Sequence, residues 1–219
     1  MAIAYVGAAE VDSSGASTTH TLSVTPSGNF MLIGFNSSDA TDTITSVVFN
    51  TSETCTRVDE VLNIAGASSF LYYIENPTNT TADIVITSSA SITCRPIIAW
   101  WYSGADGGFT DSNTGSADPA STLSVAVTPS DDNSWVAGFF GTPGQTAATA
   151  TSGSTKRNPG NQRGLAVDHN AAITPPASTS VGVDGTSNGY LGIVAAFSPT
   201  AGAVGGGRDA RALTLLGVG

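Results

Sequence analysis

A sequence pattern that recurs about one hundred residues apart constrains the fold of this chain more than any other feature. The motif TLSVTPS of the first half returns as TLSVAVTPS in the second half. Four segments have such a counterpart, in the same order: 21–27 with 122–130, 29–35 with 133–140, 54–57 with 154–157, and 96–102 with 191–197. These matches predict an internal duplication, with similar halves at about 1–103 and 121–199.

The repeated segments have the pattern of β-strands. In residues 21–24 and again in 122–127, Thr, Ser or Ala alternates with Leu or Val, which is the period of two expected when one face of a strand is packed and the other is solvated. Clusters of Gly, Pro, Asn, Asp and Ser separate such runs. We predict strands near 2–7, 20–25, 29–36, 43–49, 54–61, 68–75, 82–88, 91–103, 121–128, 133–141, 146–151, 154–158, 163–169, 178–183 and 188–198.

Composition points to the same fold class. Charged residues make up 11% of the chain, against about 25% in typical soluble domains, whereas the abundant Thr and Val suit a pleated surface. We therefore expect an all-β, antiparallel β-sandwich of jelly-roll or concanavalin-like type over residues 1–199, whose two halves cover each other's apolar faces. Two tandem immunoglobulin-like domains are the alternative, because about 100 residues is their usual size.

Two segments are predicted to lie outside the folded halves. Residues 104–120, rich in Gly, Asp and Ser, are expected to link the halves. Residues 200–219 form a Gly-rich hinge followed by a C-terminal arm, which is either a frayed terminus or a segment that docks on a neighbouring subunit as an added strand. The residues expected to make that docking contact are Arg208, Arg211, Leu213, Leu215, Leu216 and Val218.

The charge balance argues against several classes of partner. Seven Lys and Arg against seventeen Asp and Glu give a net charge of −10, unlike a nucleic-acid-binding protein or one that attaches to an anionic membrane. No apolar run approaches the ~20 residues that span a bilayer. The first residues lack a basic segment and a long apolar run, so we expect synthesis in the cytoplasm.

The residues that could support catalysis are few. The histidines, His20 and His169, are not part of a recognisable nucleophile motif. Asp59 and Glu60 are adjacent on a predicted strand, so their side chains point to opposite faces and do not form a pair of catalytic acids. Cys55 and Cys94 match no metal or redox spacing and are expected to be buried thiols, although the sequence leaves open whether they pair. We expect no enzymatic activity and no cofactor.

Two groups of residues are candidates for ligand binding. Asp111, Asn113 and Asp118 supply oxygen atoms that suit calcium, but the segment lacks the glutamate and spacing of a calcium loop, so turn chemistry explains it and no metal is expected. Tyr72, Trp100 and Trp101 could stack on a sugar ring. Both tryptophans, however, continue the apolar run of residues 97–99, which favours packing in the core.

Four ordered segments, 22–26, 54–57, 69–77 and 82–87, resemble the β-sandwich proteins of tailed-phage virions, among them head decoration (cement) proteins and tail or fibre modules. The likeness extends over residues 1–199. It implies assembly on a capsid or tail in a symmetric oligomer, without catalysis. We therefore predict a virion structural protein, made in the host cytoplasm, that decorates a capsid by binding neighbouring subunits. The alternative is a carbohydrate-binding module of a tail or fibre.

Overall fold

The structure, a computed structural model of the chain, describes residues 2–12, 15–144, 148–160, 163–174, 176–187 and 189–199, with the backbone alone at 106–108, 120, 186 and 187. These residues form antiparallel strands and contain no helix, which confirms the all-β prediction. In the first half the strands are β1 (Ala4–Val11), β2 (Ser17–Val24), β3 (Phe30–Ser37), β4 (Ile44–Phe49), β5 (Glu53–Thr54), β6 (Thr56–Ile64), β7 (Ala67–Glu75), β8 (Ala82–Ile92) and β9 (Cys94–Ser103). In the second half they are β10 (Ala105–Ala117), β11 (Ala120–Val127), β12 (Trp135–Gly141), β13 (Thr149–Ala150), β14 (Thr155–Lys156), β15 (Gly164–Asp168), β16 (Thr179–Ser187) and β17 (Tyr190–Pro199).

The first half has the strand order of a jelly roll. Sheet A has the order β1-β9-β3-β7-β6, and sheet B has the order β2-β8-β4-β5. Because Cys55 alone separates β5 from β6, these two form a single strand that passes from sheet B to sheet A. Counted in this way, the first strand pairs with the eighth, the second with the seventh, the third with the sixth and the fourth with the fifth, as in a double-sheet jelly roll.

The second half repeats this arrangement. Sheet C has the order β10-β17-β12-β15-β14, and sheet D has the order β11-β16-β13. Each strand of sheets C and D occupies the place of a strand of sheets A and B. The sequence matches fall on equivalent strands: β2 with β11, β3 with β12, β5 and β6 with β14, and β9 with β17.

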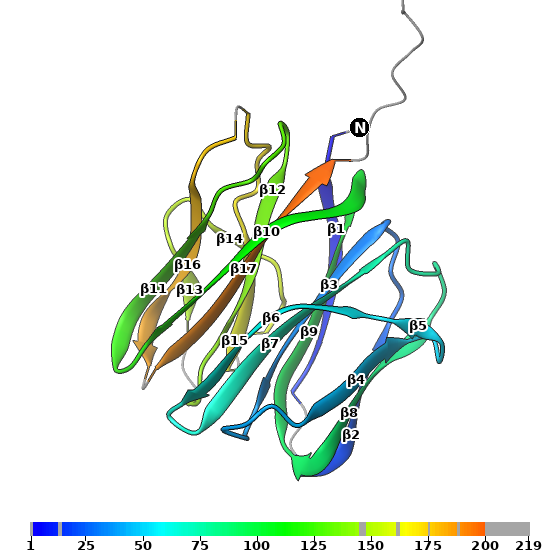
Figure 1. Cartoon of the computed structure of the whole chain (residues 1–219), viewed down its shortest axis with the longest axis vertical. Helices are drawn as coiled ribbons and strands as arrows, with labels where there is room; N and C mark the ends of the chain where they lie inside the picture. Colours follow the sequence, from blue (N-terminus) through cyan, green and yellow to red (C-terminus); the bar gives the residue numbers. More distant parts are fainter. Residues whose placement is uncertain are drawn as a thin grey trace, which may run out of the picture.

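The four sheets stack in the order B, A, C, D (Figure 1). An apolar cluster that includes Phe35, Phe49 and Ile86 lies between sheets A and B, and another that includes Val136 and Val181 lies between sheets C and D. A third cluster joins the halves across sheets A and C and consists of Ile3, Phe30, Leu32, Leu71, Ile98, Trp100, Tyr102, Ala105, Trp135, Ala137, Phe139, Ala166, Ile193, Ala195 and Phe197. We call this third cluster the shared core.

The shared core explains which strands alternate and which do not. β2, in an outer sheet, alternates between exposed and buried residues over Thr19–Val24. In contrast, every residue of β3 and of β12 is buried, because sheets A and C have a neighbouring sheet on both faces. Continuous apolar runs in the sequence therefore mark the two inner layers.

The inner sheets approach so closely that some positions tolerate no side chain. A Cβ atom on Gly34 of β3 would lie 2.4 Å from the Phe139 ring of β12. A Cβ atom on Gly141, at the end of β12, would lie 1.8 Å from Oδ1 of Asn36. Glycine at these positions allows the two sandwiches to pack as one block.

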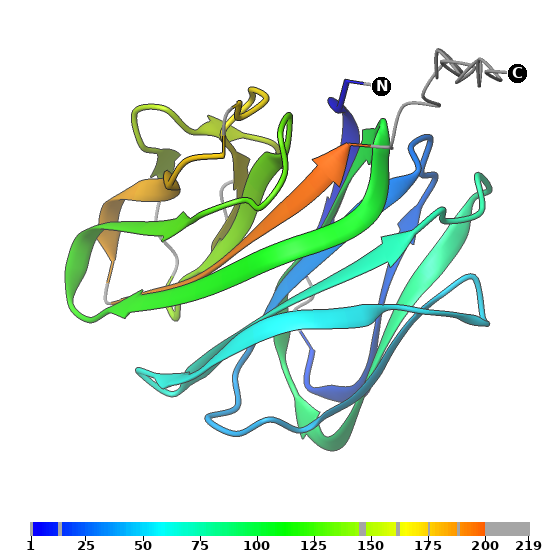
Figure 2. The same ribbon diagram turned by 45° about the horizontal axis from the view of Figure 1, so that its top comes forward.

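Two expectations require correction. Residues 104–120 are largely not a linker, because they contain β10, which pairs with β17 along the edge of sheet C (Figure 2). The second concerns the single sandwich expected over residues 1–199, which consists of two sandwiches. Each half closes its own two-sheet sandwich, and the two sandwiches are then joined through the shared core.

Candidate functional site

A buried polar network lies at the edge of the shared core. Asp168, at the end of β15, is fully buried and accepts hydrogen bonds at Oδ2 from the Tyr102 hydroxyl (2.8 Å) and from Nε of Arg157 (2.7 Å). The guanidinium of Arg157 lies 4.3 Å from the centre of the Tyr5 ring, and the Tyr5 hydroxyl donates to the Arg157 carbonyl (3.0 Å). The network therefore ties β1 and β9 of the first half to the second half.

Burial governs the titration of these groups. Removal from water raises the pKa of Asp168, although the ion pair with Arg157 and the hydrogen bond from Tyr102 act in the opposite direction. The pKa of Tyr102 is raised well above its usual value, first by burial and then by the neighbouring carboxylate. Because Asp168 Oδ2 is held by Tyr102 of the first half and Arg157 of the second, this network joins the two halves.

A second set of contacts attaches β1 to the other half. Oε2 of Glu10 accepts hydrogen bonds from Nδ2 of Asn158 (2.9 Å) and from the backbone N–H of Gly160 (2.7 Å). Asn158 in turn accepts a hydrogen bond from the Ala166 N–H at 2.9 Å. Polar bridges thus supplement the shared core along its rim.

The ring of His20 and the backbone of His169 are held by hydrogen bonds. Nε2 of His20 lies 3.1 Å from the Ile92 carbonyl and 3.2 Å from the Ser17 carbonyl, so this nitrogen carries the hydrogen. The backbone N–H of His169 bonds to the Val136 carbonyl at 3.0 Å. His20 therefore connects the start of β2 to the end of β8.

The side chains of the adjacent acids Asp59 and Glu60 have different partners in the structure. Glu60 joins Asp42 around the guanidinium of Arg57, whereas Asp59 accepts a hydrogen bond from the Ser112 hydroxyl of β10 at 3.4 Å. Partial burial opposes ionisation of Asp42, but the hydrogen bonds from Arg57 and the Ile44 N–H outweigh it and lower the pKa of that carboxyl. The pKa of Glu60 is raised, chiefly by partial burial.

Both cysteines are free and buried. Burial raises the pKa of each thiol to about 12, with the charge of Glu53 adding to the effect at Cys55. Since the thiolate is the reactive form, Cys55 and Cys94 act as apolar side chains of the core between sheets A and B.

The aromatic residues considered for sugar stacking are interior residues. Trp100 is 0% exposed and belongs to the shared core, while Tyr72 and Trp101 are 5% and 7% exposed and pack between sheets A and B. A Cβ atom on Gly7 of β1 would lie 3.0 Å from the Trp101 ring, so β1 covers that ring. The possible glycan contact through these three rings is contradicted, because a sugar needs an exposed ring face, and the rings pack in the core as the apolar run around the tryptophans favoured.

The candidate calcium ligands do not converge. Asp111 and Asn113 lie on β10, and Asp118 follows its last residue, so about 20 Å of extended strand separates Asp111 from Asp118. Nδ2 of Asn113 donates to the Ala126 carbonyl at 2.8 Å. In the described part of the chain, no three His, Cys, Asp or Glu residues are grouped to hold a metal ion.

The proposed docking residues of the C-terminal arm, which are Arg208, Arg211, Leu213, Leu215, Leu216 and Val218, lie outside the described residues.

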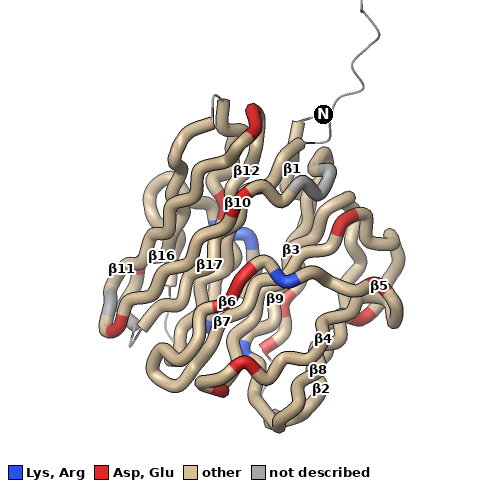
Figure 3. Tube along the Cα trace, viewed as in Figure 1, with Lys and Arg blue, Asp and Glu red and all other residues tan. Residues whose placement is uncertain are grey.

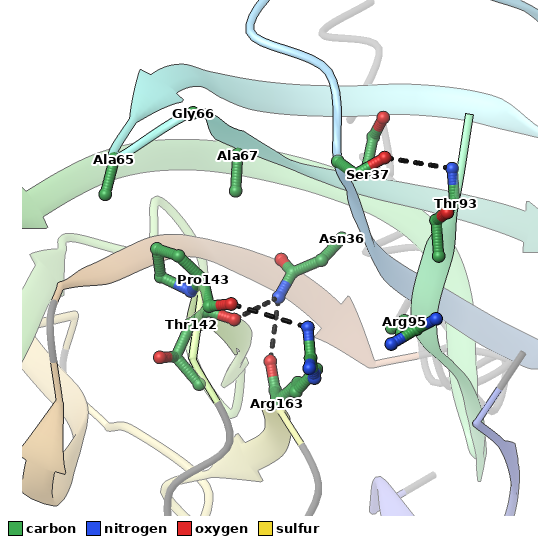
Figure 4. A pocket seen from close by; sticks show the side chains of 11 residues that line it. Asn36, Ser37, Ala65, Gly66, Ala67, Thr93, Arg95, Thr142, Pro143 and Arg163 are labelled. Atoms are coloured by element: carbon green, nitrogen blue, oxygen red, sulfur yellow. Dashed lines mark hydrogen bonds between the residues drawn. The ribbon is translucent and has the colours of Figure 1, made fainter. Parts of the chain in front are cut away.

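A polar cleft of about 120 Å³ opens between the two halves, at the end of sheet A opposite Ala4 and Ser103 (Figure 4). The end of β3, the β6–β7 turn, the β8–β9 junction and segments after β12 and before β15 form its lining. The lining residues are Asn36, Ser37, Ser38, Ala65, Gly66, Ala67, Thr93, Arg95, Thr142, Pro143 and Arg163.

Asn36 fixes the floor of this cleft. Its Oδ1 accepts a hydrogen bond from the Ser69 hydroxyl, and its Nδ2 donates to the carbonyls of Arg163 (2.7 Å) and Thr142 (3.3 Å). The sequence alone did not predict this cleft. The signal it contained was the occurrence of two arginines, Arg95 and Arg163, at strand starts in a chain with few basic residues, but the topology was needed to bring them together.

Comparison with known proteins assigns no family. No family model matches the chain, and no curated protein is a significant match. Among the described residues there is no helix long and apolar enough to cross a membrane.

Proposed function

We propose that this chain is a non-enzymatic structural protein of a virion, and more specifically a capsid decoration protein that binds neighbouring subunits. The observation that carries the proposal is the joining of two sandwiches of jelly-roll order into one four-layer block. Jelly rolls are common in viral capsid proteins and in lectins. Since a fold alone does not define a function, the use made of the polar groups provides further support.

Several groups that could perform chemistry are engaged in holding the block together. Asp168 binds Arg157 and Tyr102 across the two halves, His20 bridges two strand ends, and both thiols lie in a core. Such use of reactive groups suits a protein whose role depends on its rigidity and its surfaces.

The sparse charge of the surface is also compatible with assembly. Figure 3 shows few Lys and Arg positions, with Asp and Glu spread over both halves. Broad areas of the outer sheets carry Thr and Ser instead, as on β2 and β11. Burying such hydroxyl-rich surface against a neighbouring subunit removes fewer charges from water than burying an ordinary surface would.

The test is to isolate virus particles from the source of this chain by density-gradient banding and to quantify the chain by mass spectrometry against the main capsid protein. We expect a fixed molar ratio that persists through repeated banding. Absence of the chain from washed particles would contradict a structural role.

Self-association is tested separately. Light scattering on the purified full-length chain, coupled to size exclusion, should give the mass of an oligomer. That mass should be a whole-number multiple of the 21.9 kDa of one chain, with a multiple of at least two. A monomer at every concentration would rule out the oligomer and leave binding to particles to be tested alone.

A lectin function would require a sugar-binding surface that does not use Tyr72, Trp100 and Trp101, because these rings are buried. A depression at one end of sheet B is lined by Ser23, Asn50, Thr51, Thr81, Ala82, Asp83 and Val85. This lining has polar groups but no aromatic ring for stacking on a sugar. We therefore favour assembly over glycan binding, and saturable binding on a glycan array would reverse that preference.

A further inference from the structure

The polar cleft between the halves concentrates positive charge in an acidic protein. Arg95 and Arg163 both line it, and none of the eleven lining residues is acidic, although the whole chain has seventeen acidic and seven basic residues. Figure 4 shows the two arginine side chains together in the view, across from the Ala65–Ala67 turn. A cleft lined by charged groups of one sign raises the local concentration of counter-ions.

Arg163 differs from the arginines that stabilise the fold. Arg57 is bound by two carboxylates and Arg157 by one. Within the described part of the chain, Arg163 forms no ion pair. Its guanidinium donates one long hydrogen bond, 3.5 Å, to the Pro143 carbonyl, and its Nε is buried without an acceptor. A partly buried guanidinium that lacks a carboxylate retains capacity for a charge-assisted hydrogen bond.

The backbone and its supports hold Arg163 in place. The residue has a left-handed backbone conformation, with φ of 51°, which is uncommon outside glycine. Its carbonyl accepts hydrogen bonds from Nδ2 of Asn36 (2.7 Å) and from the Thr142 N–H (2.9 Å). These contacts come from both halves, so the cleft exists because the two sandwiches are joined.

We propose that this cleft binds a small oxyanion group, a carboxylate or a phosphate, between Arg95 and Arg163. A volume of about 120 Å³ is small beside the roughly 300–1,000 Å³ of sites for drug-sized ligands, which suits one such group. The planar guanidinium fork matches the oxygens of either oxyanion. This site is independent of the proposed structural function, because a decoration protein need not bind an anion and an anion-binding protein need not be part of a virion.

The test is a titration of the ¹⁵N-labelled full-length chain with sodium acetate and, separately, with sodium phosphate, each at an ionic strength held constant with sodium chloride. The arginine Nε–Hε signals are followed by NMR. We expect saturable shifts of the Arg95 and Arg163 signals with at least one of the two anions, and the stronger of the two responses identifies a carboxylate or a tetrahedral ligand.

Arg163→Gln should weaken binding about tenfold or more, because a charge-assisted hydrogen bond is lost. Arg163→Lys keeps the charge but loses the fork, and should weaken binding less. Arg57→Gln, which removes an arginine outside the cleft, is the matched control and should bind as the wild type does. The amide spectrum of each variant establishes that it is folded.

Shifts that rise linearly without saturation, or affinities that are equal in Arg163→Gln, Arg163→Lys and Arg57→Gln, would overturn the proposal. If Arg163→Gln fails to fold, the comparison of Arg163→Lys with Arg57→Gln decides the question.

Discussion

At the residue scale, the arrangement around Asp168 shows how this chain places a charge in its interior. The carboxylate is 0% exposed, but it receives hydrogen bonds from Arg157 and Tyr102. A buried ion pair contributes little net stability relative to an apolar pair, because desolvation offsets the attraction. Removal of one partner nevertheless leaves the other charge uncompensated.

Asp168→Ala should therefore lower the free energy of unfolding by about 3 kcal/mol or more, measured by urea denaturation at pH 7. The matched control is Asp42→Ala, whose ion pair with Arg57 has both side chains 29% exposed. That change should cost at most about 1 kcal/mol, since water screens the pair. Equal losses for the two variants would contradict the structural role given to the buried pair.

The pH dependence of stability should have opposite signs at the two carboxylates. The folded state raises the pKa of Asp168, so this group holds its proton more tightly when folded and its contribution to stability falls as pH rises through that pKa. The folded state lowers the pKa of Asp42, so the contribution of that group is lost as pH falls.

Denaturation of the wild type, Asp168→Asn and Asp42→Asn between about pH 3 and pH 7 tests these signs. With rising pH, the wild type should lose stability relative to Asp168→Asn and gain stability relative to Asp42→Asn. The same slope for both differences would show that burial does not dominate at Asp168.

The close approach of sheets A and C makes a prediction at Gly34. Because its added Cβ atom would lie 2.4 Å from the Phe139 ring, Gly34→Ala should destabilise the protein by about 1–3 kcal/mol through overpacking. Gly15→Ala provides the comparison, since a Cβ atom there meets nothing within 4 Å. Thermal unfolding of the two variants should show a clear loss in the first and little change in the second.

At the scale of the elements, burial on both faces divides the strands into two classes. The inner strands β3, β9, β12 and β17 were predictable as continuous apolar runs, and β2 and β11 as alternating ones. β10 was missed because its sequence, ADGGFTDSNTGSA, has the composition of a loop. It is an edge strand, and its backbone pairing with β17 provides the stabilisation that its small and polar side chains do not.

The candidate site could not be predicted for a related reason. Arg95 and Arg163 belong to different halves, and what joins them is the packing of sheet A on sheet C. A single sequence shows that the halves are similar, but it does not show which pair of faces meets. The burial of the aromatic residues was easier to predict than the cleft, because the apolar residues around Trp100 and Trp101 already favoured the core.

Hydrogen exchange should distinguish the inner strands from the edge strands. Backbone amides of β3, β9, β12 and β17 should exchange slowest, because each of these strands is paired on both sides within an inner sheet. Amides of the short edge strands β13 and β14 should exchange much faster. Mass spectrometry of peptides after deuterium labelling measures the difference, and rapid exchange in β3 or β12 would contradict the burial described here.

At the scale of the whole molecule, the internal duplication has produced a layered block. Each half encloses an apolar core of its own, and the shared core adds a third between them. The exposed faces belong to sheets B and D and to the strand edges, whereas the inner faces are unavailable to partners. The proposed function depends on this rigidity, since a decorating subunit presents fixed surfaces to its neighbours.

The shared core makes the halves dependent on one another for stability. Exposing Phe30, Trp100, Phe139 and Phe197 to water would be unfavourable. Phe139→Ala, in the shared core, should reduce the stability of both halves by about 3–5 kcal/mol.

Differential scanning calorimetry of the full-length chain and of Phe139→Ala tests the joined block most directly. We predict one transition in each protein, with a calorimetric enthalpy equal to the van't Hoff enthalpy, and a single transition that moves to lower temperature in the variant. Two separable transitions in the wild type would contradict the account, as would a variant in which half of the enthalpy shifts and the other half stays in place.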